Sequence, residues 1–230
     1  MTHSFEKDYW EQHWVQAGRT TTADRAESTA NPYLVRETSG LAPGTALDAG
    51  CGTGAEALWL AGQGWSVIGA DISAAALGQA AERAATVSTA DRVTWVQADL
   101  TTWEPEGLFD LVVTNYAHPA IPQLAFYDRI ADWVAPGGTL LIVGHLHHAG
   151  GPAHTHDGTH EHKGAHQDTP HRVQLDHGDE PPVEATVTLA DITGRLDPRV
   201  WRIDTAEEHT RPGGQGRPLH DVVVRASRLA

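Results

Sequence analysis

The sequence predicts an α/β fold, with a seven-stranded, mostly parallel sheet, helices on both of its faces and a closing antiparallel hairpin. Three observations lead to this prediction. Short apolar runs alternate with segments long enough for a helix, as in a parallel sheet built from strand–helix–strand units. Polar residues follow these runs, at the edge where open α/β sheets bind ligands. Two further strand-like runs, connected through Gly-Gly-Gln-Gly, close the chain.

Residues 1–40 are expected to form a lid that precedes the sheet. A helix near its start carries aromatic side chains within reach of one another: Phe5, Tyr9, Trp10 and Trp14. Gly18 ends this helix, and a second helix begins at Pro32. An aromatic stripe of this kind is usually core. Because it precedes the first strand, it also has the place of a cover over the ligand, which makes Trp10 and Trp14 candidate substrate-binding residues.

The run from Thr45 to Gly54 reads as a buried strand that turns sharply into a helix. Glycine suits this turn because it accepts positive φ and lets a ligand lie against the backbone. The helix that starts near Ala55 presents free N–H groups to an anionic or polar ligand. The spacing of Gly50, Gly52 and Ala55 also fits the dinucleotide-binding fingerprint G-x-G-x-x-G/A. In that interpretation Asp71 binds the ribose hydroxyls of the dinucleotide.

The later elements follow in chain order. Helices are expected at 55–63, at 74–85 after a Ser73 cap, at 121–134, and at 188–196 from a Thr188 cap. Strands are expected at 65–71, 92–98, 109–115, 139–145, 200–204 and 220–226, with a turn at 136–138. The strand ends carry a series of polar residues: Asp48, Asp71, Asp99, Asn115 and His145. They should therefore meet at one edge of the sheet.

The motif Leu47-Asp-Ala-Gly-Cys-Gly-Thr-Gly54 resembles the first motif of class I S-adenosylmethionine (SAM)-dependent methyltransferases. The order of the later motifs is similar to this family along residues 41–230: Gly69-Ala-Asp-Ile-Ser73, Gln97-Ala-Asp-Leu100, Phe109-Asp-Leu-Val-Val113 and Pro136-Gly-Gly-Thr-Leu-Leu-Ile142. Residues 9–18 and 59–64 look like the thiopurine S-methyltransferase and tellurite-resistance branch. The resemblance implies one Rossmann-like domain over residues 1–230, and SAM as the cofactor.

The resemblance also implies roles for the residues at the strand ends. The cofactor-binding set is Asp48, Gly50, Gly52, Gly54, Asp71, Ile72, Asp99, Leu100 and Asn115. The three glycines would line the methionine part of SAM, with Asp48 near its amino group. Asp71 would accept from the ribose hydroxyls and Asp99 from the adenine amino group, because both of these ligand groups offer donors.

Methyl transfer is an in-line displacement, so the enzyme mainly aligns the acceptor. A small molecule is the expected acceptor. The sequence Asn115-Tyr-Ala-His-Pro119 departs from the Asn-Pro-Pro-aromatic motif of DNA and protein methyltransferases, which weakens nucleobase and amide acceptors. A nitrogen or hydroxyl acceptor usually needs a base, whereas a thiolate does not. Tyr116, His118 and His145 are the catalytic candidates, and Tyr116 and His118 are also expected to bind substrate.

Residues 146–182 read as a histidine-rich insertion without apolar periodicity. Candidate ligands for Zn²⁺, Ni²⁺ or Cu²⁺ are His145, His147, His148, His154, His156, His160 and His162. Two alternatives follow for the function: a methyltransferase whose insertion holds a metal that activates the acceptor, or a non-enzymatic metal-binding module. A solvated loop that binds metal only adventitiously is the third interpretation. An NAD-dependent oxidoreductase is disfavoured, since no Tyr-x-x-x-Lys pair is present.

The composition excludes some partners. A net charge of −14 with two lysines argues against a nucleic-acid surface. One cysteine, Cys51, excludes an internal disulfide. Without a signal segment or an 18-residue apolar run, the sequence predicts a cytoplasmic protein away from membranes. Monomer and homodimer both remain open.

Overall fold

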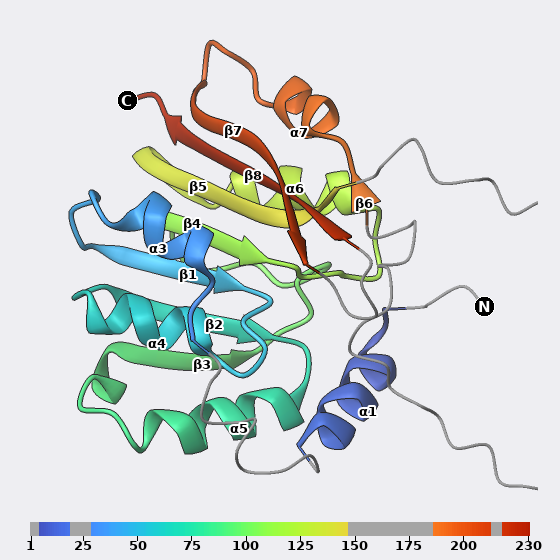
Figure 1. The fold of residues 1–230 in the computed structure, drawn as a ribbon. Coiled ribbons are helices and arrows are strands. Elements are labelled where there is room, and N and C mark those ends of the chain that lie inside the picture. Colours follow the sequence, from blue (N-terminus) through green and yellow to red (C-terminus); the bar gives the residue numbers. More distant parts are fainter. Residues whose placement is uncertain (1–4, 19–28, 147–185, 213–217) are drawn as a thin grey trace, which may run out of the picture.

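The computed structural model describes residues 5–18, 29–146, 186–212 and 218–230 (Figure 1). Its helices are α1 Lys7–Ala17, α3 Pro32–Thr38, α4 Ala55–Gly62, α5 Ala74–Ala84, α6 Gln123–Ala131 and α7 Leu189–Arg195, with a 3₁₀ turn at Ala90–Arg92. Its strands are β1 Thr45–Ala49, β2 Ser66–Asp71, β3 Val93–Gln97, β4 Phe109–Asn115, β5 Val134–Leu146, β6 Thr186–Val187, β7 Trp201–Pro212 and β8 Pro218–Arg228. None of these helices is long and apolar enough to cross a bilayer.

The strands form one sheet in the order β3-β2-β1-β4-β5-β8-β7 (Figure 1). The first five are parallel, and β8 and β7 run antiparallel at the edge. The α/β sheet with a closing hairpin is confirmed. The described residues hold eight strands instead of seven, because Thr186 and Val187 add a short parallel strand, β6, beside the end of β5.

Successive residues of the central strands face opposite sides of the sheet and pack into two cores. On β1, Leu47 and Ala49 join the core beneath α6 and α7, while Ala46 joins the core beneath α3 and α4. The same alternation places Leu140 in the first core and Leu141 in the second. Strands buried on both faces must be apolar throughout, which explains the continuous apolar runs of the sequence.

The predicted helix starts rest on side-chain caps. Asn31 Oδ1 accepts from the N–H of Tyr33 at 2.9 Å, with Pro32 as the first helical residue of α3. Ser73 Oγ caps α5 by accepting from Ala76 N–H at 3.1 Å. Thr188 Oγ1 caps α7 in the same way, at 3.1 Å from the N–H of Asp191. These caps satisfy backbone donors that the helices leave without partners.

The predicted turn at residues 136–138 is instead an irregularity within β5. Its pairing with β4 advances from Phe109↔Val134 to Leu111↔Thr139, so β5 carries extra residues at this point. Gly137 has φ +81°, a conformation that glycine adopts without strain. The chain therefore bulges and continues along the same strand.

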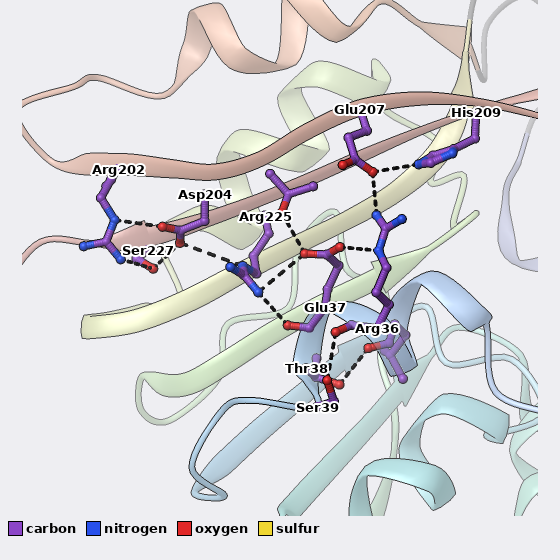
Figure 2. A network of polar contacts seen from close by, with 12 residues as sticks. Arg36, Glu37, Thr38, Ser39, Arg202, Asp204, Glu207, His209, Arg225 and Ser227 are labelled. Carbon is purple, nitrogen blue, oxygen red and sulfur yellow. Dashed lines mark hydrogen bonds and ion pairs between the residues drawn. The ribbon is translucent and has the colours of Figure 1, made fainter.

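A polar network joins α3 to the closing hairpin (Figure 2). Glu37, only 5% exposed, bonds Arg36 Nε at 2.6 Å and the Thr205 hydroxyl at 2.7 Å. Arg225 donates from Nη1 to the backbone carbonyl of Glu37 at 2.9 Å. Arg36 also reaches Glu207 at 2.7 Å on the hairpin. The network therefore fixes an early helix to strands that lie more than 160 residues later in the chain.

Candidate active site

A cavity of about 620 Å³ is lined by residues at the carboxyl ends of the parallel strands and by residues of α1. Helix α1 lies beside this end of the sheet (Figure 1). Residues predicted to bind the cofactor line the cavity: Gly50, Gly52, Asp71, Ile72, Asp99, Leu100 and Asn115. The predicted substrate and catalytic residues line it as well: Trp10, Trp14, Tyr116, His118 and His145. A cavity of this size matches the usual range for small-molecule sites.

The glycine corner forms one wall. Gly50 has φ +81°, and a Cβ on it would lie 2.3 Å from Cβ of Ala117, so only glycine allows the loop after β4 to approach. Gly50 N–H donates to the carbonyl of Ala70 at 2.8 Å, which ties the corner to β2. Trp14 of the lid packs against Gly52, 3.0 Å from where a Cβ would lie. The backbone is thus open to the cavity and covered by the lid.

Asp71 connects this corner to the next helix. Its Oδ2 accepts from Gly52 N–H at 2.8 Å, and its Oδ1 accepts from Ser73 N–H at 2.9 Å. Each carboxylate oxygen has two lone pairs, so one on each oxygen is left for another donor. Burial raises the pKa of Asp71, while the N–H groups of Ser73 and Gly52 act in the opposite direction.

Two predicted cofactor residues do not line the cavity. Gly54 has φ +77° as the N-cap of α4, and a Cβ there would lie 2.4 Å from the Trp95 ring, so it serves packing. Asp48 is only 1% exposed and lies behind the corner, since its side chain points into the protein. Burial raises the pKa of Asp48 well above its usual value, and the nearby charges of Glu56 and Asp71 add to this.

The remaining predicted cofactor residues differ in how they are held. Asp99 is exposed, and its Oδ1 accepts from the N–H and hydroxyl of Thr101, at 2.9 and 2.6 Å. Leu100 is buried beside it. Asn115 lines the cavity with both amide atoms buried and without a hydrogen-bond partner among the described residues. Buried polar groups are usually hydrogen-bonded, so this amide is available to a ligand in the cavity.

Helix α1 is attached to the domain by polar contacts. The Glu11 carboxylate accepts from Ser73 Oγ at 2.8 Å and from Ala75 N–H at 3.2 Å, at the start of α5. Trp10 Nε1 donates to the carbonyl of His118 at 3.1 Å, and Gln79 Nε2 donates to that of Trp14 at 3.0 Å. No residue of α1 is fully buried. The helix therefore covers the cavity without being part of either core.

A column of ring side chains in mutual contact forms another wall of the cavity, with the two pairs His118–His145 and His145–Tyr116 stacked. The ring centroids of Phe5 and His118 lie 5.7 Å apart, those of His118 and His145 5.4 Å, and those of His145 and Tyr116 4.6 Å. The Arg211 guanidinium ends the column, 5.5 Å from the Tyr116 centroid. Tyr116 has φ +53°, which is strained for a residue other than glycine. The column draws on segments from both ends of the chain.

The column is largely uncharged at neutral pH. Burial lowers the pKa of His118, and burial together with neighbouring His118 lowers the pKa of His145 to about 4. Burial and the charge of Asp221 raise the pKa of the Tyr116 hydroxyl. Arg211 is paired through Nε with the fully buried Asp221 at 2.7 Å. The cavity therefore meets two neutral imidazoles and a neutral phenol.

The metal hypothesis has only one of its candidate ligands among the described residues, His145, whose Nδ1 is buried without a partner there. His147, His148, His154, His156, His160 and His162 lie outside the described residues, as does the insertion beyond Leu146. The described part of the chain holds no group of three His, Cys, Asp or Glu arranged to bind a metal ion.

Several residues of the site were not predicted from the sequence: Phe5, Glu11, Gln123, Arg211 and Asp221. Phe5 and Glu11 belong to the expected lid helix. They contact site residues only because this segment packs against the sheet domain. Arg211 lies on β7 and Asp221 on β8. The pairing of β7 with β8 and of β8 with β5 brings them near Tyr116. Gln123 had no signal beyond its place at the start of α6.

Comparison with known proteins decides the family. A family model described as a methyltransferase domain matches residues 46–138. The chain is 31% identical over 157 residues to thiocyanate methyltransferase 1 of Brassica oleracea, an alignment that covers 66% of this chain and 69% of that protein. The chain belongs to the class I SAM-dependent methyltransferases. This methyltransferase is also 32% identical over 139 residues to probable thiol methyltransferase 2 of Arabidopsis thaliana, covering 58% and 60% of the two chains.

The fold of this methyltransferase agrees with solved enzymes. The 1,6-didemethyltoxoflavin-N1-methyltransferase of Burkholderia thailandensis, solved with S-adenosylhomocysteine, has a TM-score of 0.62 at 18% identity over 100% of this chain and 92% of that one. The chain is a SAM-dependent small-molecule methyltransferase near the thiol methyltransferase branch. The open glycine corner and the unpaired Asn115 amide fit a cofactor with many polar groups.

Proposed function

We propose that this enzyme methylates the sulfur of a small thiol. The relatives named for thiocyanate and for thiols support a sulfur acceptor. We call the wall formed by the column of Phe5, His118, His145, Tyr116 and Arg211 the acceptor wall. The observation that carries the proposal is the chemistry of this wall. Its available bases are His118 and His145, and burial lowers the pKa values of both. Such a wall suits an acceptor that loses its proton easily.

The pKa values separate the acceptor classes. A thiol has a pKa of about 8.5 and an ordinary histidine about 6.5, so this proton transfer costs roughly 3 kcal/mol. A hydroxyl with a pKa near that of water, about 15.7, would cost roughly 12 kcal/mol with the same base. The lowered pKa values of His118 and His145 widen both gaps. The free-energy cost of proton transfer to these histidines becomes prohibitive for a hydroxyl, whereas it does not for a thiol.

The wall also suits the change of charge in the reaction. SAM supplies an electrophilic methyl group on a sulfonium, and its positive charge and the negative charge of a thiolate both vanish during transfer. Water stabilises the separated charges, so a cavity that excludes water favours their loss. Phe5, Trp10 and the His118 ring supply apolar surface at this end, and the lid closes it.

The residues take the following roles in the proposal. Gly50, Gly52 and Asp71 hold the methionine and ribose parts of SAM, while Ile72, Asp99 and Leu100 contact the adenine. Asn115 supplies its unpaired amide to a ligand in the cavity. Trp10, Tyr116 and His145 enclose the acceptor, and His118 takes the thiol proton. Asp48 and Gly54 act on the shape and charge of the corner from behind it.

The test is a transfer assay with methyl-labelled SAM. We expect label in thioether or methyl thiocyanate products from a panel of small thiols and thiocyanate, and none from alcohols or amines of matched size. The Asp71→Ala variant is the control, with weakened SAM binding in calorimetry and no transfer. Labelled amine or ether products without any thioether would contradict the proposal.

The metal-assisted alternative is tested separately on metal-stripped protein. Calorimetric titration with SAM is repeated with one equivalent of Zn²⁺ or Ni²⁺ present, followed by the transfer assay. We expect the same SAM affinity and the same thiol transfer in both states. Transfer that requires the added ion would place the metal-assisted alternative first.

A further inference from the structure

Gln123 lies at the start of α6, directly behind His118 as seen from the cavity. Its side chain is only 5% exposed, and it does not line the cavity, whereas His118 does. The amide makes two contacts with the loop after β4. Nε2 donates to the carbonyl of Ala117 at 2.9 Å, and Oε1 lies 3.2 Å from Nδ1 of His118.

These two contacts determine each other. The Ala117 carbonyl can only accept a hydrogen bond, so the NH₂ group of Gln123 must face it. The amide oxygen then faces His118, and an amide oxygen can only accept. Nδ1 of His118 must therefore carry a hydrogen. In a neutral imidazole the other nitrogen, Nε2, then holds the lone pair.

We infer that Gln123 is a positioning residue that holds His118 in the tautomer whose free lone pair, on Nε2, faces the cavity. Gln123 occupies Nδ1, so Nε2 is the ring nitrogen that His118 has left to present to the cavity it lines. Phe5 and His145 pack against the ring of His118, with centroids 5.7 and 5.4 Å away, so the ring is held against rotation. The acceptor proton therefore meets a lone pair and not an N–H.

The inference rests on the proposed function for its consequence in catalysis. The thiol proton moves to Nε2 of His118, and the electron pair of the S–H bond stays on the thiol sulfur. This sulfur then forms a bond to the methyl carbon of bound SAM while the bond from that carbon to the sulfonium sulfur breaks, and the electron pair of the broken bond leaves with the neutral thioether, S-adenosylhomocysteine. In the His118 cation that results, the Nδ1–H still donates to Gln123, so the amide oxygen also stabilises the developing charge. Without Gln123, both neutral tautomers of His118 would be populated. In the Nε2–H tautomer, the nitrogen that faces the cavity has no lone pair and cannot accept the thiol proton.

The tautomer is measured directly by ¹H–¹⁵N correlation spectra of histidine-labelled protein, with His118 assigned by comparison with His118→Gln. We expect the Nδ1–H form in the wild type. Gln123→Leu, similar in volume but without an acceptor, should give a mixture or the Nε2–H form. Gln123→Glu again places an oxygen opposite Nδ1 and should restore the Nδ1–H form. Ile130→Val, a conservative change of another buried residue of α6, should leave the tautomer unaltered.

The same Gln123 variants are then compared by their kcat and KM values in the transfer assay. Gln123→Leu should lower kcat for thiol transfer at least about tenfold with little change in KM for SAM, and Gln123→Glu should recover most of it. The acid limb of the kcat profile should move to higher pH in Gln123→Glu, because a carboxylate favours the imidazolium. A folded Gln123→Leu protein that keeps the Nδ1–H form would overturn the inference.

The two proposals fail in different ways. The spectra need no acceptor, so the tautomer and its loss in Gln123→Leu stand even if no thiol is methylated. Thiol transfer together with an unaltered tautomer in Gln123→Leu would sink the role of Gln123 and leave the proposed function in place.

Discussion

Asn115 and His145 carry polar atoms that are buried at the cavity without a hydrogen-bond partner among the described residues. A buried unpaired polar group costs about 1–3 kcal/mol. A ligand that bonds to these atoms recovers that cost, so the site is held ready for polar contacts at these two positions. Asp48 Oδ2, which lies just behind the glycine corner, is also buried and has no hydrogen-bond partner among the residues that the structure describes.

Asp48 makes stability depend on pH. Because burial raises its pKa in the folded state, the folded protein retains a proton that the unfolded chain releases at about pH 3.9. Its contribution is therefore fully present below that pH and is lost as the pH rises through the folded pKa. Asp48→Asn cannot ionise, so we expect it to raise the unfolding free energy at pH 8 by about 1 kcal/mol or more.

The measurement is the melting temperature of ligand-free wild type and variant between pH 4 and pH 8. The two proteins should agree near pH 4 and separate as the pH rises, with Asp48→Asn the more stable. Glu106→Gln, on the exposed surface, is the matched control and should follow the wild type. Parallel curves for wild type and Asp48→Asn would show that Asp48 is not the group responsible.

Sequence reasoning located the cavity residues that follow strand ends. Asp71, Asp99 and Asn115 line the cavity because parallel strands end at one edge. It did not separate these residues from Asp48 and Gly54, which lie in the same motif and do not line the cavity: Asp48 is buried behind the corner, and the ring of Trp95 occupies the space beside Gly54. Gln123 was beyond its reach, since its contact with His118 depends on how the start of α6 meets the loop after β4.

Among the elements, α1 differs from the others because polar contacts hold it in place. The Glu11 carboxylate bonds at the start of α5, where a negative charge is favoured by the helix dipole and by free N–H groups. Contacts of this kind contribute about 0.5–2 kcal/mol. The docked position of the lid is therefore of modest stability, in keeping with an element that must open to admit ligands.

Glu11→Ala should loosen the lid without unfolding the domain. We expect faster hydrogen exchange in residues 7–17 and a Kd for SAM raised by about threefold to tenfold, because part of the docking energy is lost. The melting temperature should change little, since no α1 residue is fully buried. Asp8→Ala, an exposed acid on the same helix, is the control. Unchanged exchange in Glu11→Ala would refute the role of Glu11 in docking.

The helices were predicted well where a cap marks their start. Ser73 and Thr188 each bond the backbone as expected, and Asn31 caps the helix that was expected from Pro32. Helix α6 is shorter than predicted at both ends: Pro122 precedes its first residue, and Val134 already pairs with Phe109 as the first residue of β5. The continuation of β5 through the glycines depends on pairing with β4, and the length of β7 depends on pairing with β8, so local sequence did not reveal either.

At the scale of the whole molecule, the Glu37 network joins α3 to the closing hairpin (Figure 2). Glu37 is buried, while Arg36 and Arg225 are partly exposed, with 45% and 28% of their side chains accessible. Removing one charge from a buried pair leaves its partner uncompensated. Solvent around the two arginines reduces this cost.

Glu37→Gln should therefore lower the unfolding free energy by about 1–3 kcal/mol. The measurement is urea denaturation at neutral pH, with SAM absent. Glu207→Gln is the matched control, because Glu207 bonds the same Arg36 from an exposed position and should have little effect. Equal shifts of the urea midpoint in the two variants would contradict a special contribution of the buried carboxylate.

The parallel sheet with its closing hairpin and the edge that holds the cavity followed from the sequence, because alternating strands and helices allow few parallel arrangements. The order of the strands in the sheet was not predicted. The acceptor wall did not follow. Its column joins Phe5, His118, His145, Tyr116 and Arg211, which meet only through the docking of the lid and the pairing of the hairpin.

This column also bears on how such an enzyme changes over generations. The glycine corner and Asp71 come from one short stretch of the chain, whereas the outer members of the column, Phe5 and Arg211, come from its two flanks. Substitutions at these two outer positions would alter the wall that we propose for the acceptor without replacing Gly50, Gly52 or Asp71. The acceptor could therefore change over generations while the methyl donor stays the same.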